Sequence, residues 1–374
     1  MSSQPPINPG LEGVIAGKTA ICKVRADIDK LIYRGYDSSE LAVNAAFEET
    51  AHLLIVGHLP NRSELDQFKS ALHTERAIEA PIIDLIRAIP PAMHPMDVLR
   101  TSVSACAAWD PDVGDNSHEA NVRKAIRLLA KIPAILGARQ AHRDGRDPLE
   151  ASPERSHAAN LLAALTGKIP DDEEASILNA SLTLYAEHGF NASTFAARVC
   201  ASTLSDMHSC ITAAIGTLKG PLHGGANEAA MEMLEKIGTL EKAERWVLAA
   251  LARKEKIMGF GHRVYRRWDS RAVTLRALGR KLAIKRKQTR WADIADEVEM
   301  VMKREKNLFP NVDFPCAWVY RLLELPVNTY TPIFAAARVA GWAAHVIEQH
   351  DDNRLIRPLE DYTGPLEAAY QPPT

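Results

Sequence analysis

Apolar side chains recur along this chain mostly at the spacing of an α-helix. Two segments show the pattern most clearly: Ala230, Met233, Leu234 and Ile237, and Ile294, Val298, Val301 and Met302. Gly238 directly follows the first segment and is expected to end that helix. The dominant helical period therefore predicts a mainly α fold.

Signals for other elements are fewer. Thr331 and Pro332 form an N-cap and first-turn pair that is expected to open a helix through the alanine-rich segment Ile333 to Glu348. Alternation typical of strands is found mainly in Thr19 to Tyr36, which predicts one or two β-hairpins. Two loops rich in Asp, Gly, Pro and Ser are expected in the first half, Asp110 to Asn121 and His142 to His157.

The length of 374 residues is near twice that of an ordinary domain, so we expect two domains or one bilobed unit. Hydrophobic residues make up 46% and charged residues 25%, which is typical of a soluble globular protein. The 45 basic and 47 acidic side chains nearly cancel, and this lack of a positive excess argues against nucleic acid as a partner.

Neither a membrane nor a metal centre is expected. The N-terminus lacks the basic start and apolar run of a secretory signal. The apolar stretch Ile333 to Ile347 contains Arg338 and is shorter than the roughly 20 residues that span a bilayer. The five cysteines are scattered without a C-x-x-C pair, so reduced thiols in a cytoplasmic protein are expected. We interpret the basic run from Arg276 to Arg290 as a solvated helix face.

One candidate site residue, His223, lies in the segment Gly220 to Asn227, which reads G-P-L-H-G-G-A-N before a predicted helix. The dipole at a helix N-terminus opposes protonation of a nearby imidazole. A neutral His223 would donate a hydrogen bond to a carbonyl oxygen that gains negative charge. A capping histidine in a tight turn is an equally good interpretation of this segment alone.

A second candidate, His262, lies in the glycine-rich and cationic segment Lys256 to Arg266, with Asp269 and Arg271 close behind. Free N–H groups and guanidinium groups at such a turn suit an anionic ligand. The dinucleotide-binding fingerprint is not met, because no third glycine follows and no strand precedes.

A third candidate, Asp313, is held between apolar residues and prolines in the segment Phe309 to Pro315. Desolvation raises the basicity of a carboxylate, which suits a general base. An Asp that caps the next helix is the alternative interpretation.

Three further residues extend the candidate set. Arg338 lies among alanines on a helix built for close packing, so its guanidinium is expected to face an anion. His188 and Arg357 are less informative alone, and a core histidine is the default interpretation of His188. Together the histidines, the Asp and the arginines favour enol chemistry on a polycarboxylate, with the Asp as base and arginines holding carboxylates.

Segments along nearly the whole chain resemble the citrate synthase family in matching order. They start with Gly10 to Val14, R-G-Y from Arg34 and H-P-M-D from His94, and continue with G-P-L-H-G-G-A-N, G-F-G-H-R-V-Y and N-V-D-F. The resemblance implies a two-domain, mainly helical homodimer with a small N-terminal β-hairpin region. It implies a large domain of residues 1–222 and 320–374, a small domain of residues 223–319, and the substrate in the cleft between them.

The same resemblance implies condensation of an acyl-CoA with oxaloacetate and hydrolysis of the thioester, without cofactor or metal. Asp313 corresponds to the base that deprotonates the acyl group, His223 to the enol-stabilising histidine and His262 to the one that polarises the oxaloacetate carbonyl. The residues expected to bind oxaloacetate are His188, Arg271, Arg338 and, from the partner subunit, Arg357. Contacts with coenzyme A are expected from Lys254, Lys256, Met258 and Arg266.

Within the family, the sequences of the motif segments are most similar to those of 2-methylcitrate synthases, which prefer propionyl-CoA. The relevant runs are A-E-H-G-F-N-A-S-T-F-A-A-R-V from Ala186 and R-K-E-K-I-M-G-F-G-H-R-V-Y from Arg253. Ser270 stands where a proline is common and Pro315 where a tyrosine is usual, so both are expected to alter the acyl pocket. A 2-methylcitrate synthase with side activity on acetyl-CoA is expected, and a citrate synthase is the alternative.

Two other classes of protein remain as hypotheses. A metallohydrolase would use His223, His262 and Asp313 as ligands, although their wide spacing is unspecific. A catalytically silent helical binding protein would keep the fold for regulation, but the intact set of two histidines and an Asp argues against it.

Overall fold

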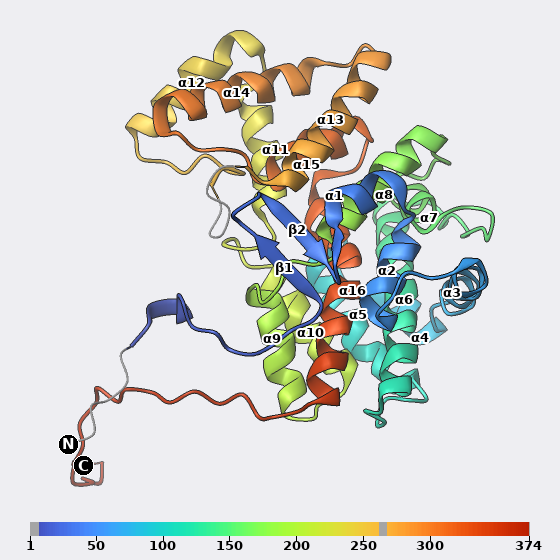
Figure 1. Ribbon diagram of the computed structural model, residues 1–374, viewed down its shortest axis with the longest axis vertical. Helices are drawn as coiled ribbons and strands as arrows, with labels where there is room; N and C mark the ends of the chain where they lie inside the picture. Colours follow the sequence, from blue (N-terminus) through green and yellow to red (C-terminus); the bar gives the residue numbers. More distant parts are fainter. Residues whose placement is uncertain (1–6, 262–267, 374) are drawn as a thin grey trace.

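Helices make up most of the chain that the computed structural model describes, residues 7–261 and 268–373 (Figure 1). This confirms the predicted mainly α fold. The helices of the first part are α1 (Ser38–Asn44), α2 (Phe47–Val56), α3 (Arg62–Thr74), α4 (Ala80–Ala88), α5 (Pro95–Cys106), α6 (His118–Asp144), α7 (His157–Thr166), α8 (Asp172–Tyr185), α9 (Ala192–Ser202) and α10 (Met207–Leu218). Short 3₁₀ turns lie at Pro9–Leu11, Ala107–Trp109 and Val327–Thr329.

The helices that follow pack largely on one another before the chain returns to the first group. They are α11 (Ala226–Ile237), α12 (Leu240–Ala252), α13 (Ser270–Lys285), α14 (Arg290–Lys306) and α15 (Asp313–Leu322). α15 contacts α11 and α13, and α12 contacts α14, while α13 also reaches α8 (Figure 1). The proposed domain boundaries near residues 222 and 319 stay a prediction.

The last helix, α16 (Tyr330–Asp351), runs through the middle of the first group and contacts α2, α6, α8, α9 and α10. Its residues are buried almost without a break from Tyr330 to Ile347. A helix that is apolar on all sides belongs in the interior of a protein, and its many alanines allow neighbouring backbones to approach closely. This central position matters because α16 carries Arg338 and His345.

A small antiparallel sheet lies beside the helices, in the order β1 (Cys22–Arg25), β2 (Lys30–Tyr33) and β3 (Tyr36–Asp37). Cys22 pairs with Tyr33 and Ile32 pairs with Asp37, so the predicted hairpins are confirmed. The buried hydroxyl of Tyr33 lies 3.0 Å from the carbonyl oxygen of Glu187. The sheet is therefore anchored to the turn that carries His188.

Most of the other predicted elements are confirmed. The two apolar stripes lie buried in α11 and α14, and Gly238 caps α11. The two polar loops separate α5, α6 and α7. In the basic run, Lys285 and Arg286 form ion pairs with Glu173 and Glu174 at the surface, as expected of a solvated face.

The predicted start of the last helix is wrong. α16 begins at Tyr330, so Thr331 and Pro332 are its second and third residues and Thr329 is the N-cap. The backbone N–H of Thr331 donates to Glu228 of α11 at 3.0 Å. The carboxylate of Glu228, on another helix, therefore accepts a backbone N–H that an N-cap side chain of α16 would otherwise accept.

After α16 the chain runs away from the helical body as an extended segment (Figure 1). Large apolar side chains are exposed along it, at Leu355, Leu359, Tyr362, Leu366 and Tyr370. The five cysteines are free thiols. Within the described ranges, none of the helices has the length and apolar character that crossing a membrane requires.

Candidate active site

A cavity of about 1660 Å³ brings together most of the site residues predicted from the sequence. Its walls come from the N-terminal segment, the turn after α8, the turn before α11, the segment after α12 and the segment before α15. The predicted residues that line it are His188, His223, Lys256, Met258, Arg271, Asp313 and Arg338. Two of the predicted residues, Lys254 and Arg357, do not line it, and His262 and Arg266 lie outside the described residues.

Asp313 is the first residue of α15 and faces the cavity. Burial raises the pKa of its carboxyl to about 6, against opposing effects from Tyr185 and Arg271. The hydroxyl of Tyr185 donates to Asp313 Oδ1 at 2.6 Å. A carboxylate with a pKa near neutrality is suited to accept a proton from a weak carbon acid.

The backbone around Asp313 is held by the glycine turn that precedes the undescribed segment. Asn311 donates its N–H to the carbonyl oxygen of Gly259 at 2.9 Å, and its side chain accepts from the N–H of Asp313 at 3.0 Å. Gly259 has φ of +82°, and a Cβ there would lie 2.7 Å from the Cβ of Phe314. Only glycine fits this conformation and close approach. The turn and the start of α15 are thus one unit.

His223 lies in the turn between α10 and α11. Burial lowers the pKa of its imidazole to about 4, and the charge of Arg338 lowers it further. Its Nε2 atom lies 2.8 Å from Ser193 Oγ. A neutral imidazole is therefore supported, with burial as its main cause. The effect expected of the helix dipole stays a prediction.

Glycine at 224 allows this turn to form. The N–H of Gly224 donates to the carbonyl oxygen of Leu218 at 2.8 Å, and a Cβ at residue 224 would lie 2.5 Å from that oxygen. The chain thus folds back on the end of α10 and directs His223 toward the cavity.

His188 also lines the cavity, in a turn that a buried network holds. Both Glu187 and His345 are fully buried, and they form a hydrogen bond of 2.9 Å between Glu187 Oε1 and His345 Nε2. Arg198 donates to His345 Nδ1 at 3.1 Å, so Nδ1 is the acceptor and Nε2 carries the proton. The turn that presents His188 is therefore fixed by groups on α9 and α16.

Arg338 brings a buried positive charge to the cavity, with 1% of its surface exposed. Its Nε donates to the carbonyl oxygen of Tyr185 at 2.6 Å, and its guanidinium lies 4.8 Å from the ring centre of Phe334. Burial lowers the pKa of Arg338 below its ordinary value. The charge of Glu187 partly opposes this lowering, and an anion in the cavity would compensate the buried guanidinium further.

Arg271 is oriented by a two-pronged ion pair with Asp269. Its Nε and terminal nitrogen donate to the two carboxylate oxygens at 2.9 and 2.8 Å. Asp269 also accepts the backbone N–H of Val312 at 3.1 Å. The same carboxylate therefore positions a cavity-lining arginine and the residue next to Asp313.

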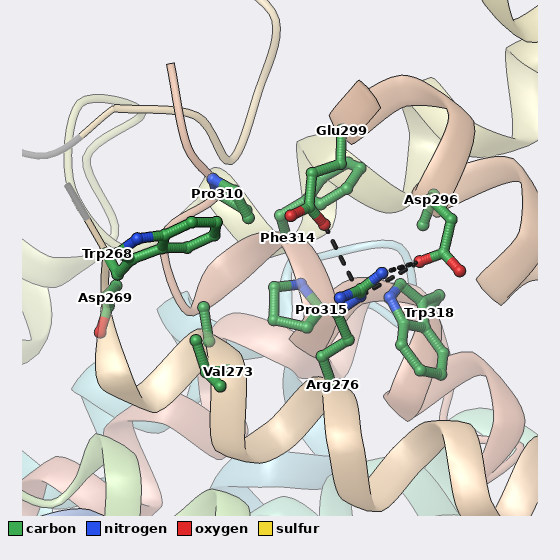
Figure 2. A pocket seen from close by; sticks show the side chains of 12 residues that line it. Trp268, Asp269, Val273, Arg276, Asp296, Glu299, Pro310, Phe314, Pro315 and Trp318 are labelled. Carbon is green, nitrogen blue, oxygen red and sulfur yellow. Dashed lines mark hydrogen bonds and ion pairs between the residues drawn. The ribbon is translucent and has the colours of Figure 1, made fainter. Parts of the chain in front are cut away.

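Pro315 does not line the large cavity, so its expected effect on the acyl pocket would act through the backbone next to Asp313 and stays a prediction. It lies in a separate cavity of about 50 Å³ behind the start of α15, together with Trp268, Phe314 and Trp318 (Figure 2). Arg276 closes one side of that cavity, paired with Asp296 and Glu299. Ser270, the first residue of α13, is likewise not among the residues that line the large cavity.

Several residues that support the site were not predicted from the sequence: Tyr185, Ser193, Glu187, Asp269 and His345. Asp269 precedes Arg271 by two residues, a spacing that does not by itself indicate an ion pair. The other contacts reach from α8 to α15, from α9 to the turn before α11, and from the turn after α8 to α16. Their partners lie up to 158 positions apart, and no local pattern signals them. Only the position of Glu187 beside His188 offered a hint.

The arrangement combines a carboxylate of raised pKa, a neutral imidazole and two buried guanidinium groups in one cavity. Such a set can remove a proton next to a carbonyl, stabilise the resulting oxyanion and hold an anionic co-substrate. The residues thus fit a reaction in which a carbon next to a carbonyl loses a proton while the arginines hold a carboxylate substrate.

The chain matches the family model described as "Citrate synthase, C-terminal domain" over residues 10–359. It is 45% identical over 364 residues to Citrate synthase 2 of Bacillus subtilis (strain 168), with 97% of each chain covered. It is 43% identical over 364 residues to 2-methylcitrate synthase of Mycobacterium tuberculosis (strain ATCC 25618 / H37Rv), covering 97% of this chain and 92% of that one. The citrate synthase of the archaeon Thermoplasma acidophilum, solved as a ternary complex with carboxymethyl coenzyme A and oxaloacetate, matches with a TM-score of 0.92 and 33% identity over 99% of both chains. The chain therefore belongs to the citrate synthase family of acyltransferases that form a carbon–carbon bond.

Proposed function

We propose that this enzyme condenses propionyl-CoA with oxaloacetate and water to give 2-methylcitrate and CoA, and accepts acetyl-CoA more weakly to give citrate. The observation that carries the condensation is the meeting of Asp313, His223 and two buried arginines in one cavity. A citrate synthase that prefers acetyl-CoA is the alternative, because relatives of similar identity carry both names.

In the first step, Asp313 takes a proton from the carbon next to the thioester carbonyl. The electron pair of that C–H bond moves to the carbonyl oxygen, and neutral His223 donates a hydrogen bond to this developing oxyanion. Burial supports both roles, because it raises the pKa of Asp313 and lowers that of His223.

In the second step, the enolate carbon attacks the ketone carbon of oxaloacetate and forms the new carbon–carbon bond. Arg271 and Arg338 would hold the carboxylates of oxaloacetate and His188 would contact it. The ternary complex of the Thermoplasma relative contains oxaloacetate and a CoA analogue, which supports these substrates. His262 is proposed to polarise the ketone, on family resemblance alone. Water then cleaves the thioester and releases CoA.

The cavity is larger than the roughly 300 to 1,000 Å³ of a typical small-ligand pocket, as two substrates require. Lys256 and Met258 line it and are proposed to contact CoA. Lys254 is exposed and does not line it, and Arg266 lies beyond the described residues, so their proposed contacts rest on resemblance. No cofactor is proposed, since the acyl-CoA is a substrate. A cytoplasmic location stays a prediction.

We propose a homodimer in which Arg357 reaches the partner's cavity. Arg357 is exposed in the extended segment after α16 and does not line its own cavity. The exposed apolar side chains on either side of it, such as Leu355 and Leu359, would be buried by a second copy of the chain. Oxaloacetate is expected to close the cleft between the proposed domains.

The test measures release of the CoA thiol from acetyl-CoA, propionyl-CoA and butyryl-CoA at saturating oxaloacetate. One methylene in an acyl pocket contributes about 1 to 3 kcal/mol. We therefore expect kcat/KM to be higher for propionyl-CoA than for acetyl-CoA, by a factor of no more than roughly 200. A higher value for acetyl-CoA would leave citrate synthase as the function.

The same assay tests the other two hypotheses. If CoA were released from none of the three thioesters, a catalytically silent binding protein would be favoured. A metallohydrolase would lose its activity after treatment with chelator, whereas the condensation should continue at full rate.

A further inference from the structure

The turn between α2 and α3 brings together two histidines and a glutamate that the proposed reaction does not use. His52 lies on α2, His58 follows the left-handed residue Gly57 at the end of that helix, and Glu64 lies in the first turn of α3. One ligand atom from each of the three side chains lies within 4.8 Å of the others. None of the three lines the large cavity.

His52 is held in one tautomer. Its Nδ1 lies 2.9 Å from the backbone carbonyl oxygen of His58, which can only accept, so Nδ1 carries the proton and Nε2 keeps a lone pair. The ring is 5% exposed and packs edge-on against Phe68, at 5.4 Å between ring centres. Metal-binding histidines usually have their second nitrogen bonded in this way to a carbonyl or carboxylate.

The other two side chains are already close to ligand spacing. His58 Nε2 lies 3.2 Å from Glu64 Oε1. Ligands on a tetrahedral zinc ion, with bonds of about 2.0 to 2.2 Å, are separated by roughly 3.3 Å. The second oxygen of Glu64 accepts the N–H of Asn61 at 2.7 Å, which fixes the carboxylate at the start of α3. His58 is half exposed, so its ring can adjust toward His52.

We propose that His52, His58 and Glu64 bind a divalent transition-metal ion, with zinc as the best fit and water as the fourth ligand. Two imidazoles and one carboxylate suit zinc better than magnesium or calcium, which prefer oxygen ligands. The metal would replace the proton that His58 and Glu64 now share and would tie α2 to α3 across the turn. This departs from the expectation, drawn from the sequence, that the chain has no metal site.

Zinc binding to the full-length protein tests the proposal. The protein is treated with chelator, dialysed and titrated with zinc alone in competition with a chromophoric zinc indicator. The wild type should bind one high-affinity zinc ion per chain. His58→Ala keeps the carbonyl that His52 bonds, and Glu64→Gln keeps a side-chain acceptor for Asn61, so both variants should fold. Each should weaken the affinity at least about tenfold, as loss of metal-site groups does.

His73→Ala is the matched control, since His73 is an exposed histidine on α3 outside the cluster. It should bind zinc like the wild type. Zinc should also raise the thermal unfolding midpoint of the wild type and of His73→Ala, but not that of His58→Ala. The proposal is overturned if the wild type binds no stoichiometric zinc, or if His58→Ala and Glu64→Gln bind it as tightly as the wild type. These readouts do not depend on enzyme activity, so their failure would leave the proposed function untouched.

Discussion

The hydroxyl of Tyr185, at the end of α8, donates a hydrogen bond of 2.6 Å to Oδ1 of Asp313, at the start of α15. This contact partly offsets the burial that raises the pKa of Asp313. The two effects together leave a carboxyl with a pKa of about 6, a value that keeps the base mostly ionised at neutral pH and still basic.

Tyr185→Phe should move the low-pH limb of the kcat/KM profile to higher pH. The hydroxyl stabilises the charged carboxylate, so its removal raises the pKa of Asp313 further, and the base becomes protonated over a wider acidic range. A hydrogen bond to a charged group contributes about 1.5 kcal/mol, which corresponds to a shift of about one pH unit. The control is Tyr320→Phe, which removes a buried hydroxyl bonded to Ser181 and should leave the limb in place. An unshifted limb in Tyr185→Phe would show that Asp313 is not the titrating base.

Asp313→Asn should lower turnover by about 100-fold or more, because the amide cannot accept the substrate proton. Oxaloacetate should still bind with nearly unchanged affinity, since Arg271 and Arg338 remain in place. Steady-state kinetics and calorimetric titration with oxaloacetate separate the two quantities. Near-normal turnover in this variant would assign the base to another residue.

His223→Ala should also reduce turnover by about 100-fold, because the developing oxyanion loses its hydrogen-bond donor. Ser193→Ala is an informative companion variant, since it removes the hydroxyl 2.8 Å from His223 Nε2 but keeps the imidazole. We expect it to cause a smaller loss. If Ser193, and not His223, contacted the reacting group, Ser193→Ala would lower kcat more than His223→Ala.

Mixing inactive subunits should restore activity if Arg357 acts across the dimer. A mixed dimer of Arg357→Ala and Asp313→Asn would hold one site with both defects and one intact site. Equal and random mixing makes half of the dimers mixed, so about a quarter of wild-type turnover should return. Proven mixed dimers without recovery would place Arg357 outside the partner's site.

Gly341→Ala should destabilise the protein by about 1 to 3 kcal/mol, as overpacking of a core does. A Cβ on this residue of α16 would collide with the carbonyl oxygen of Ala186 and with the carboxylate of Glu187. Gly216→Ala is the control, because that helical glycine has its nearest neighbour at an ordinary 3.7 Å and should gain up to about 1 kcal/mol of helix propensity. Urea unfolding of both variants measures the difference.

The sequence predicted those features whose causes are local. The stripes of α11 and α14 and the stop at Gly238 were identified because burial, period and capping act within a few residues. The start of α16 was misplaced because its donor at Thr331 is satisfied by Glu228 of another helix.

For the site, motif segments located the residues that line the cavity, but they could not show what holds them. The buried pair of Glu187 and His345 joins positions far apart in the sequence, and the low pKa of His223 arises from its burial, which only the folded chain defines. Sequence adjacency to Asp313 does not fix which way the side chain of Pro315 points, and this side chain lines the small cavity and not the large one.

Asp269 accepts hydrogen bonds both from the side chain of Arg271 and from the backbone N–H of Val312. A ligand that draws the arginine into the cavity would therefore also move the anchor of the residue before Asp313. If Arg271 moves with a bound anionic substrate, the base would be aligned only when that substrate is present. We therefore expect the thioester to be protected from cleavage when oxaloacetate is absent. The rate of CoA release without oxaloacetate would measure this protection, and loosening the anchor with Asp269→Asn should raise that futile rate relative to the productive one.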